Sequence, residues 1–232
     1  MRRHPSPQDE RRPGERHVPA WKPIAGALTS GLLVLAALVL VADRFGVPVA
    51  VFTWDGSALG DLPWYSGSIS LLNGMVWAAA AGLSLLVAWL SPQDRTRLGA
   101  LALFTGVLAT DDALQLHVFA GPDNGIPQSW FVALYAVAGA LLLLLFLCGG
   151  RPGATAAFLL GFALLGVSAA FDEVAESEVS IVEDGTKLLG AITWLAVPVI
   201  VAGRLRPARY LPGPPADRPA PGSALEREHQ QA

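Results

Sequence analysis

The chain has 232 residues, of which 53% are hydrophobic and only 15% are charged, and its formal net charge is −3. Soluble domains carry about 25% charged residues. Here the apolar residues stand in blocks of about 20, the length at which a helix crosses a hydrocarbon core of ~30 Å. The composition therefore excludes an ordinary soluble domain and predicts an all-α, polytopic membrane protein, a bundle of about six transmembrane helices. A single cysteine, Cys148, excludes an intrachain disulfide.

The chain divides into three parts. Residues 1–23 are rich in arginine and proline and lack apolar periodicity, so we expect a disordered basic cytoplasmic tail. Residues 24–203 contain the apolar blocks and predict the membrane domain, and residues 204–232 predict a second basic, proline-rich, disordered cytoplasmic tail. The expected spans of the membrane domain are 24–42, 69–90, 98–119, 130–148, 155–176 and 183–203.

The segment 43–68, between the first two expected spans, contains a short apolar run, VPVAVF, which is too short to cross a membrane. Trp54, Trp64 and Tyr65 in the same segment suit the level of the lipid headgroups. Two placements stay open for this segment, a loop on the membrane surface or a re-entrant segment.

Basic residues predict the orientation. If the N-terminus lies in the cytoplasm, every lysine and arginine except Arg44 and Lys187 lies on the cytoplasmic side. This bias follows the positive-inside rule, so we expect both termini in the cytoplasm. The bias toward alanine, glycine, proline and arginine favours a bacterial source, and hence a multi-pass protein of the bacterial cytoplasmic (inner) membrane.

Three groups of polar residues interrupt the expected spans, each with two adjacent acids and a third polar residue at position i+4. On a helix these positions fall within an arc of about 100°, so each trio faces one way. With the expected topology, all three trios lie toward the outer end of their spans, and we expect them to form one outward-facing carboxylate cluster. The trios are Asp111, Asp112 and Gln115; Asp172, Glu173 and Glu176; and Glu183, Asp184 and Lys187.

Two basic side chains, one beside the first trio and one within the third, have open roles. His117 lies five residues beyond Asp112, so a regular helix turns it away from the two aspartates, and it joins them only if the helix unwinds after Gln115. It is either an interface histidine or a metal ligand or proton carrier. Lys187 follows Glu183 at i+4, which allows either a local salt bridge or a charge that tunes a neighbouring carboxylate.

The acids near the outer ends outnumber these bases, and an ionised acid within a membrane is costly. Oxygen ligands favour calcium, magnesium or manganese, and a histidine extends the choice to iron or zinc. Three interpretations stay open. The first is a divalent-cation site that supports hydrolysis of a membrane, periplasmic or extracellular substrate. The second is a proton- or cation-coupled small transporter, and the third is a hydrated polar network that fixes helix packing or binds a partner. The candidate metal ligands are Asp111, Asp112, His117, Asp172, Glu173, Glu176, Glu183 and Asp184.

The motifs D-D-x4-H, at Asp111, Asp112 and His117, and E-D-G-x-K-x-x-G, from Glu183 to Gly190, resemble those of a group of bacterial multi-spanning membrane proteins. Members of that group often carry a glutamate directly after the histidine, where this chain has Val118. The resemblance implies no activity, because none is known for the group. Phosphate-binding glycine loops and the H-E-x-x-H zinc motif are absent from the sequence. We therefore expect the lipid bilayer as the partner and no nucleic acid, while protein partners and self-association stay open.

Overall fold

A computed structural model describes residues 19, 21–53, 65–114, 116–117, 123–149, 151–174 and 180–205. Regular structure in these residues is helical, without strands, which confirms the all-α prediction. A short 3-10 helix, η1 (Val49–Phe52), accompanies six long helices. These are α1 (Trp21–Phe45), α2 (Ser68–Leu90), α3 (Arg95–Leu114), α5 (Gln128–Leu147), α6 (Pro152–Val174) and α7 (Ser180–Ala202).

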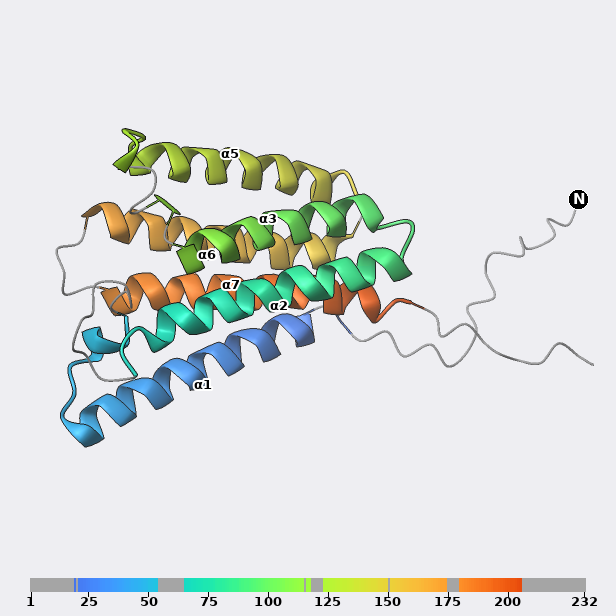
Figure 1. The fold of residues 1–232 in the computed structure, drawn as a ribbon. Coiled ribbons are helices and arrows are strands. Elements are labelled where there is room, and N and C mark those ends of the chain that lie inside the picture. Colours follow the sequence, from blue (N-terminus) through green and yellow to red (C-terminus); the bar gives the residue numbers. More distant parts are fainter. Residues whose placement is uncertain are drawn as a thin grey trace, which may run out of the picture.

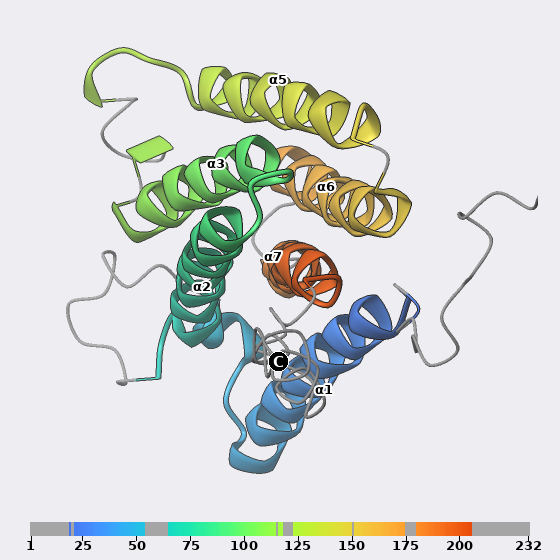
Figure 2. The same cartoon turned by 90° about the vertical axis from the view of Figure 1, so that its right-hand side faces the viewer.

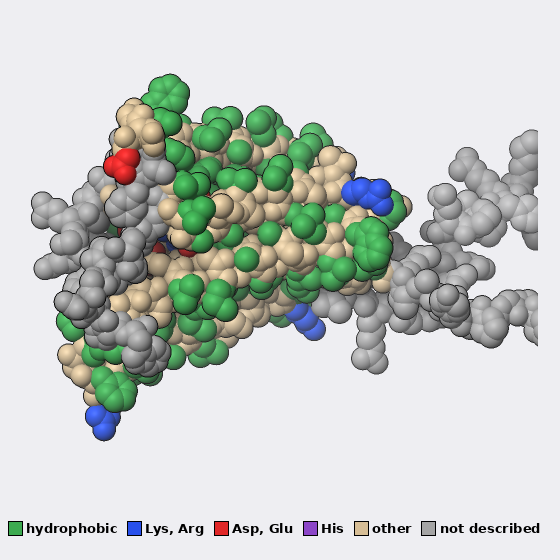
Figure 3. Space-filling model, viewed as in Figure 1, with side chains coloured by type: hydrophobic (Ala, Val, Ile, Leu, Met, Phe, Trp, Pro, Cys, Tyr) green, Lys and Arg blue, Asp and Glu red, His purple; other side chains and the backbone are tan. Residues whose placement is uncertain are grey.

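Five of the long helices, all but α3, are long and apolar enough to cross a membrane. The exception begins with Arg95 and Arg97 and ends near Asp111 and Asp112, so charged side chains stand at both of its ends. Large hydrophobic side chains are exposed along the long helices, and Figure 3 shows such side chains spread over the face of the bundle that it displays. These features identify a membrane protein.

Helix α7 forms the centre of the bundle (Figure 2), where it packs against α6, α2 and α1. Of its apolar window, 61% is buried, against 6% for that of α1, which lies at the edge. Helix α3 packs on α2, and α5 covers α3 and α6 from the outside (Figure 1).

An aromatic cluster around Trp194 fills the middle of the bundle. The indole stacks on Phe158 with ring centroids 4.8 Å apart, and Trp77 meets it edge-on at 5.4 Å. The Trp194 Nε1 donates a hydrogen bond of 2.8 Å to the carbonyl oxygen of Phe158. The buried indole therefore has its one polar atom satisfied, as large aromatic residues in cores require.

Two glycines allow α6 and α7 to approach closely beside this cluster. A Cβ atom at Gly161 would collide with the Trp194 ring and lie 2.9 Å from the Gly190 carbonyl oxygen. A Cβ atom at Gly190 would lie 3.1 Å from the Gly161 carbonyl oxygen. Small residues permit such close contact between membrane helices.

A buried aspartate ties the loops together at one end of the bundle. Asp94, between α2 and α3, accepts hydrogen bonds from Arg151 Nη2 at 2.9 Å and Nε at 3.2 Å. Arg97 Nη1 and Ser91 Oγ donate to the same carboxylate at 3.2 and 3.0 Å. The paired and hydrogen-bonded charge links the α2–α3 turn to the start of α6. We call the end of the bundle that contains Asp94, Arg97 and Arg151 the basic end.

The segment after α1 folds against the bundle in its described part. Val51, Phe52 and Thr53 are buried, and Phe52 packs with Ala42 and Ile69. Ser70 Oγ donates a hydrogen bond of 3.4 Å to the Thr53 carbonyl oxygen. This stretch therefore belongs to the helical bundle, whereas Trp54 and Trp64 lie outside the described residues.

Candidate functional site

A cavity of about 530 Å³ lies within the bundle at the end opposite Asp94. Here α3 and α6 end, and α2, α5 and α7 begin. The charged residues of its lining lie at or just beyond these helix ends, and most of the aromatic residues come from positions further along the same helices. We call it the acidic cavity. Its aromatic lining comprises Trp77, Phe104, Phe131, Tyr135, Phe162 and Trp194, and its charged lining comprises Asp111, Asp112, His117, Asp172, Glu183, Asp184 and Lys187.

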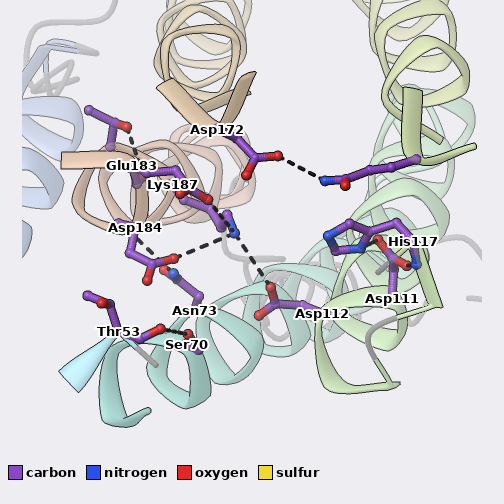
Figure 4. Close-up of polar contacts among 12 residues, drawn as sticks. Thr53, Ser70, Asn73, Asp111, Asp112, His117, Asp172, Glu183, Asp184 and Lys187 are labelled. Carbon is purple, nitrogen blue, oxygen red and sulfur yellow. Dashed lines mark hydrogen bonds and ion pairs between the residues drawn. The ribbon is translucent and has the colours of Figure 1, made fainter. Parts of the chain in front are cut away.

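Lys187 lies among three carboxylates (Figure 4). Its Nζ is 3.6 Å from Asp184 Oδ1 and 3.7 Å from Glu183 Oε1, both on the preceding turn of α7. It is also 4.0 Å from Asp112 Oδ1 of α3. The ion pair that the i+4 spacing allows is therefore present, and the same ammonium group also links α7 to α3.

The Asp112 side chain is held between two other helices. Its Oδ2 lies 3.6 Å from the position that a Cβ atom would take at Gly74 of α2, so the absence of a side chain there leaves room for the carboxylate. One residue before Gly74 on α2, Asn73 Nδ2 donates to the Asp184 carbonyl oxygen at 3.5 Å. The polar residues thus connect α2, α3 and α7 at this level.

Asp111 pairs with His117. The histidine Nδ1 lies 2.8 Å from Asp111 Oδ2, and its backbone N–H donates to Asp111 Oδ1 at 3.0 Å. Asp111 is buried, whereas the His117 side chain is 25% exposed and lines the acidic cavity. Because the carboxylate holds Nδ1, the other ring nitrogen is the one left for a ligand or a proton.

Asp172, on α6, completes the set of acids that line the acidic cavity. It is exposed, and its Oδ2 accepts a hydrogen bond of 2.9 Å from Gln128 Nε2 at the start of α5. Figure 4 shows the Asp172 carboxylate engaged in this bond and separate from that of Asp112. The side chain of Glu173 and all of Gln115 and Glu176 lie outside the described residues.

Sequence analysis missed several residues of the site. Asn73, Gln128 and Tyr135 come from helices in which no polar trio was recognised. A signal existed for Asn73, the single amide in an otherwise apolar span, and a weaker one for Gln128 at the beginning of another. Thr53 and Ser70 also line the cavity, but nothing in their local sequence separates them from other loop and helix hydroxyls.

The described candidate metal ligands are divided between three sets of contacts: those of Lys187, the Asp111–His117 pair and the Asp172–Gln128 pair. Among the residues that the structure describes, no three histidine, cysteine, aspartate or glutamate side chains are grouped to hold a metal ion. The Lys187 ammonium stands between the carboxylates of Asp112, Glu183 and Asp184, where a metal would need to bind. The described side chains therefore do not fit a metal centre, and the site for calcium, magnesium, manganese or zinc stays a prediction.

Comparison with known proteins gives one family. A family model described as a domain of unknown function (DUF8692) matches residues 32–201, which span all six long helices except the first part of α1 and the last residue of α7. No curated protein and no solved structure matches the chain.

Proposed function

We propose that this chain, which belongs to the DUF8692 family of domains of unknown function, binds the ammonium group of an organic molecule in the acidic cavity. One observation carries the proposal: carboxylates from α3, α6 and α7 and a set of aromatic side chains line the same cavity. Clefts lined by one sign of charge concentrate ions of the opposite sign. Aromatic faces also attract organic cations.

The charge of the lining favours a positively charged ligand. Its acids outnumber its bases, since Lys187 and His117 are the only lining residues that can carry positive charge among those described. An organic cation would therefore enter a region where negative charge is in excess. An anionic ligand would meet the same carboxylates and be repelled.

The size and apolar walls of the cavity favour an organic cation over a bare ion. Its volume of about 530 Å³ lies within the range of roughly 300–1,000 Å³ typical of small-molecule sites. A cation over an aromatic face gains about 2 kcal/mol when it is removed from water. An ammonium group with attached alkyl carbons can use both the charge at the helix ends and the aromatic lining.

The polarity of the bundle supports the expected location. Arg95, Arg97, Arg151 and Arg204 stand at the basic end, opposite the cavity. We therefore propose a bacterial cytoplasmic membrane, both termini in the cytoplasm and an acidic cavity on the outer side.

A titration of the purified protein tests the proposal. In a non-ionic maltoside micelle, calorimetry should detect binding of butyltrimethylammonium and no binding of its uncharged carbon isostere. Asp112→Asn should weaken binding roughly tenfold, equivalent to ~1.4 kcal/mol, because it removes one carboxylate and leaves Lys187 less compensated. Equal binding of the cation and the isostere would overturn the proposal.

Asp43→Asn is the matched control. Asp43 is an exposed acid in the last turn of α1, near the same end of the bundle, and it does not line the acidic cavity. Its amide variant should bind butyltrimethylammonium as the unaltered chain does. Calcium, manganese and zinc are titrated in parallel, and stoichiometric binding of a metal without binding of the ammonium probe would favour the divalent-cation prediction instead.

A second candidate function is proton-coupled transport of such cations. The observation that favours it is the Asp111–His117 pair, which faces the cavity and can exchange a proton near neutral pH. In proteoliposomes, uptake of the ammonium probe should then depend on a pH gradient and lose that dependence in His117→Gln. Uptake that is independent of the pH gradient would contradict proton coupling, but it would not contradict the proposal that the cavity binds the ammonium group.

A further inference from the structure

A second hollow of about 700 Å³ lies beside the acidic cavity, along α2 and α3. Its lining is almost entirely small or aliphatic. Leu85, Leu103 and Val107 are exposed on its walls, in the part of the bundle whose sides are apolar. We call it the lateral groove, and its lining comprises Ala81, Leu85, Gly99, Ala102, Leu103, Gly106, Val107, Thr110, Asp111, Leu116 and Tyr135.

Glycines keep the lateral groove open. A Cβ atom at Gly99 would meet no atom within 4 Å, and one at Gly106 would meet only Ala81 Cβ, at 3.9 Å. From Gly99 to Asp111 the groove follows α3 for ~18 Å at 1.5 Å per residue. That length is more than half of the ~30 Å thickness of a hydrocarbon core.

The lateral groove and the acidic cavity share two lining residues, Asp111 and Tyr135. Tyr135 belongs to α5, the outermost helix at this face (Figure 1), and it interacts with the Asp111 carboxylate. These two side chains therefore form the boundary between an apolar surface groove and a charged interior site. A molecule that spans the boundary would place an apolar part outside and a polar part inside.

We propose that the natural ligand of the acidic cavity is a lipid with an ammonium headgroup, which enters from the bilayer past Tyr135 and leaves its hydrocarbon chain in the lateral groove. This inference rests on the proposed function and adds the substrate class and the route. The groove faces the membrane, where lipid chains are already as apolar as its walls. The hydrocarbon chain of the lipid therefore gains little free energy by moving from the bilayer into the groove. The carboxylates of the acidic cavity supply the selectivity for the headgroup.

The test compares two ammonium compounds that differ in chain length. Hexadecyltrimethylammonium can occupy both the cavity and the groove, whereas butyltrimethylammonium fits the cavity alone. Gly106→Leu and Val107→Trp add bulk to the groove from α3, and neither Gly106 nor Val107 lines the acidic cavity. Both variants should weaken binding of the long compound at least about tenfold and leave the short compound unaffected, whereas Asp112→Asn should weaken both.

Gly82→Leu is the control for added bulk. Gly82 is exposed on α2, has open space around it and lines neither hollow. It should change neither affinity. Val107→Trp keeps the test decisive if Gly106→Leu fails to fold, because Val107 is 44% exposed on the groove wall and a larger side chain there can extend over the groove without entering the contact between α2 and α3.

The outcomes separate the two proposals. If the unaltered chain binds neither compound, the proposed function fails. If it binds both and the groove variants bind both equally well, ammonium binding stands and the lateral route is wrong. Native mass spectrometry gives a second readout: a dimer that the groove variants dissociate would show that a second copy of the chain covers the groove, and would overturn the lipid assignment.

Discussion

Adjacent residues in α3 serve different partners. Asp111 pairs with His117 and interacts with Tyr135, whereas the Asp112 carboxylate lies near the Lys187 ammonium group and next to Gly74. The i, i+1, i+4 pattern predicted one shared face, and neighbouring positions on a helix are in fact 100° apart, enough to reach two different neighbouring helices. Sequence spacing therefore identified the residues but could not assign each carboxylate to its partner.

The sequence could predict contact between His117 and Asp111 only on the condition that the helix unwinds before the histidine. A regular helix would turn it away from Asp111, and contact required the helix to unwind. The structure meets that condition, because the α-helix ends at Leu114 and the His117 backbone N–H donates to the Asp111 side chain. A carboxylate that captures a backbone N–H competes with the helical hydrogen bond and promotes such an ending.

Lys187→Gln is expected to strengthen binding of butyltrimethylammonium, the opposite effect to Asp112→Asn. The substitution removes a positive charge that lies 3.6–4.0 Å from three carboxylates, so those carboxylates become available to the ligand. A rise in affinity of roughly threefold to tenfold should appear by calorimetry. Weaker binding in Lys187→Gln would show that the lysine contributes to the ligand site and would contradict the electrostatic account.

His117→Gln is expected to flatten the pH dependence of ammonium binding. The hydrogen bond to the Asp111 carboxylate raises the pKa of His117 above that of an ordinary histidine, so as pH falls through this raised pKa His117 gains a positive charge that opposes the ligand. Asp111, Asp112 and Lys187 face the histidine, and the carboxylates take up protons at lower pH than a histidine does. In the unaltered chain affinity should therefore rise from pH 5.5 to 8 on the order of tenfold, and in His117→Gln it should change much less over this interval.

The elements were largely predictable because long apolar runs can satisfy their backbone only as helices inside a membrane. The helix α2 at Ser68–Leu90 agrees within one residue with the span expected at 69–90. The largest difference is the end of α3, at Leu114 instead of residue 119, where the polar side chains of the site interrupt the helix. Segment length and composition set the spans, but the contacts of the site set their ends.

Gly161→Ala is expected to destabilise the protein through the α6–α7 contact. The added Cβ atom would overlap the Trp194 ring and the Gly190 carbonyl oxygen, and overpacking of this kind costs about 1–3 kcal/mol. Gly166→Ala on the same helix is the matched control, because a Cβ atom there meets nothing within 4 Å and alanine favours a helix over glycine by about 1 kcal/mol. Thermal unfolding in detergent should place Gly161→Ala below the unaltered chain and Gly166→Ala at or above it, and equal midpoints for the two variants would contradict the packing account.

At the scale of the whole molecule, the helices separate charge between the two ends of the bundle. Arginines gather at the basic end around Asp94, and the acids gather at the cavity. The sequence could predict this polarity because alternating helix direction sends successive loops to opposite sides. It could not predict the lateral groove or its link to the cavity, since both depend on how far α5 stands from α3 and on which side chains line the gap.

The single cysteine provides a direct test of orientation. Cys148 is exposed after the last residue of α5, at the basic end, and Asp43 is exposed at the opposite end in the last turn of α1. With both termini in the cytoplasm, a membrane-impermeant maleimide added to intact spheroplasts should leave Cys148 unlabelled. It should label Asp43→Cys in a Cys148→Ser background, and detergent permeabilisation should expose Cys148. The reverse pattern would place the acidic cavity on the cytoplasmic side, where the same carboxylates could take ammonium lipids only from the inner leaflet.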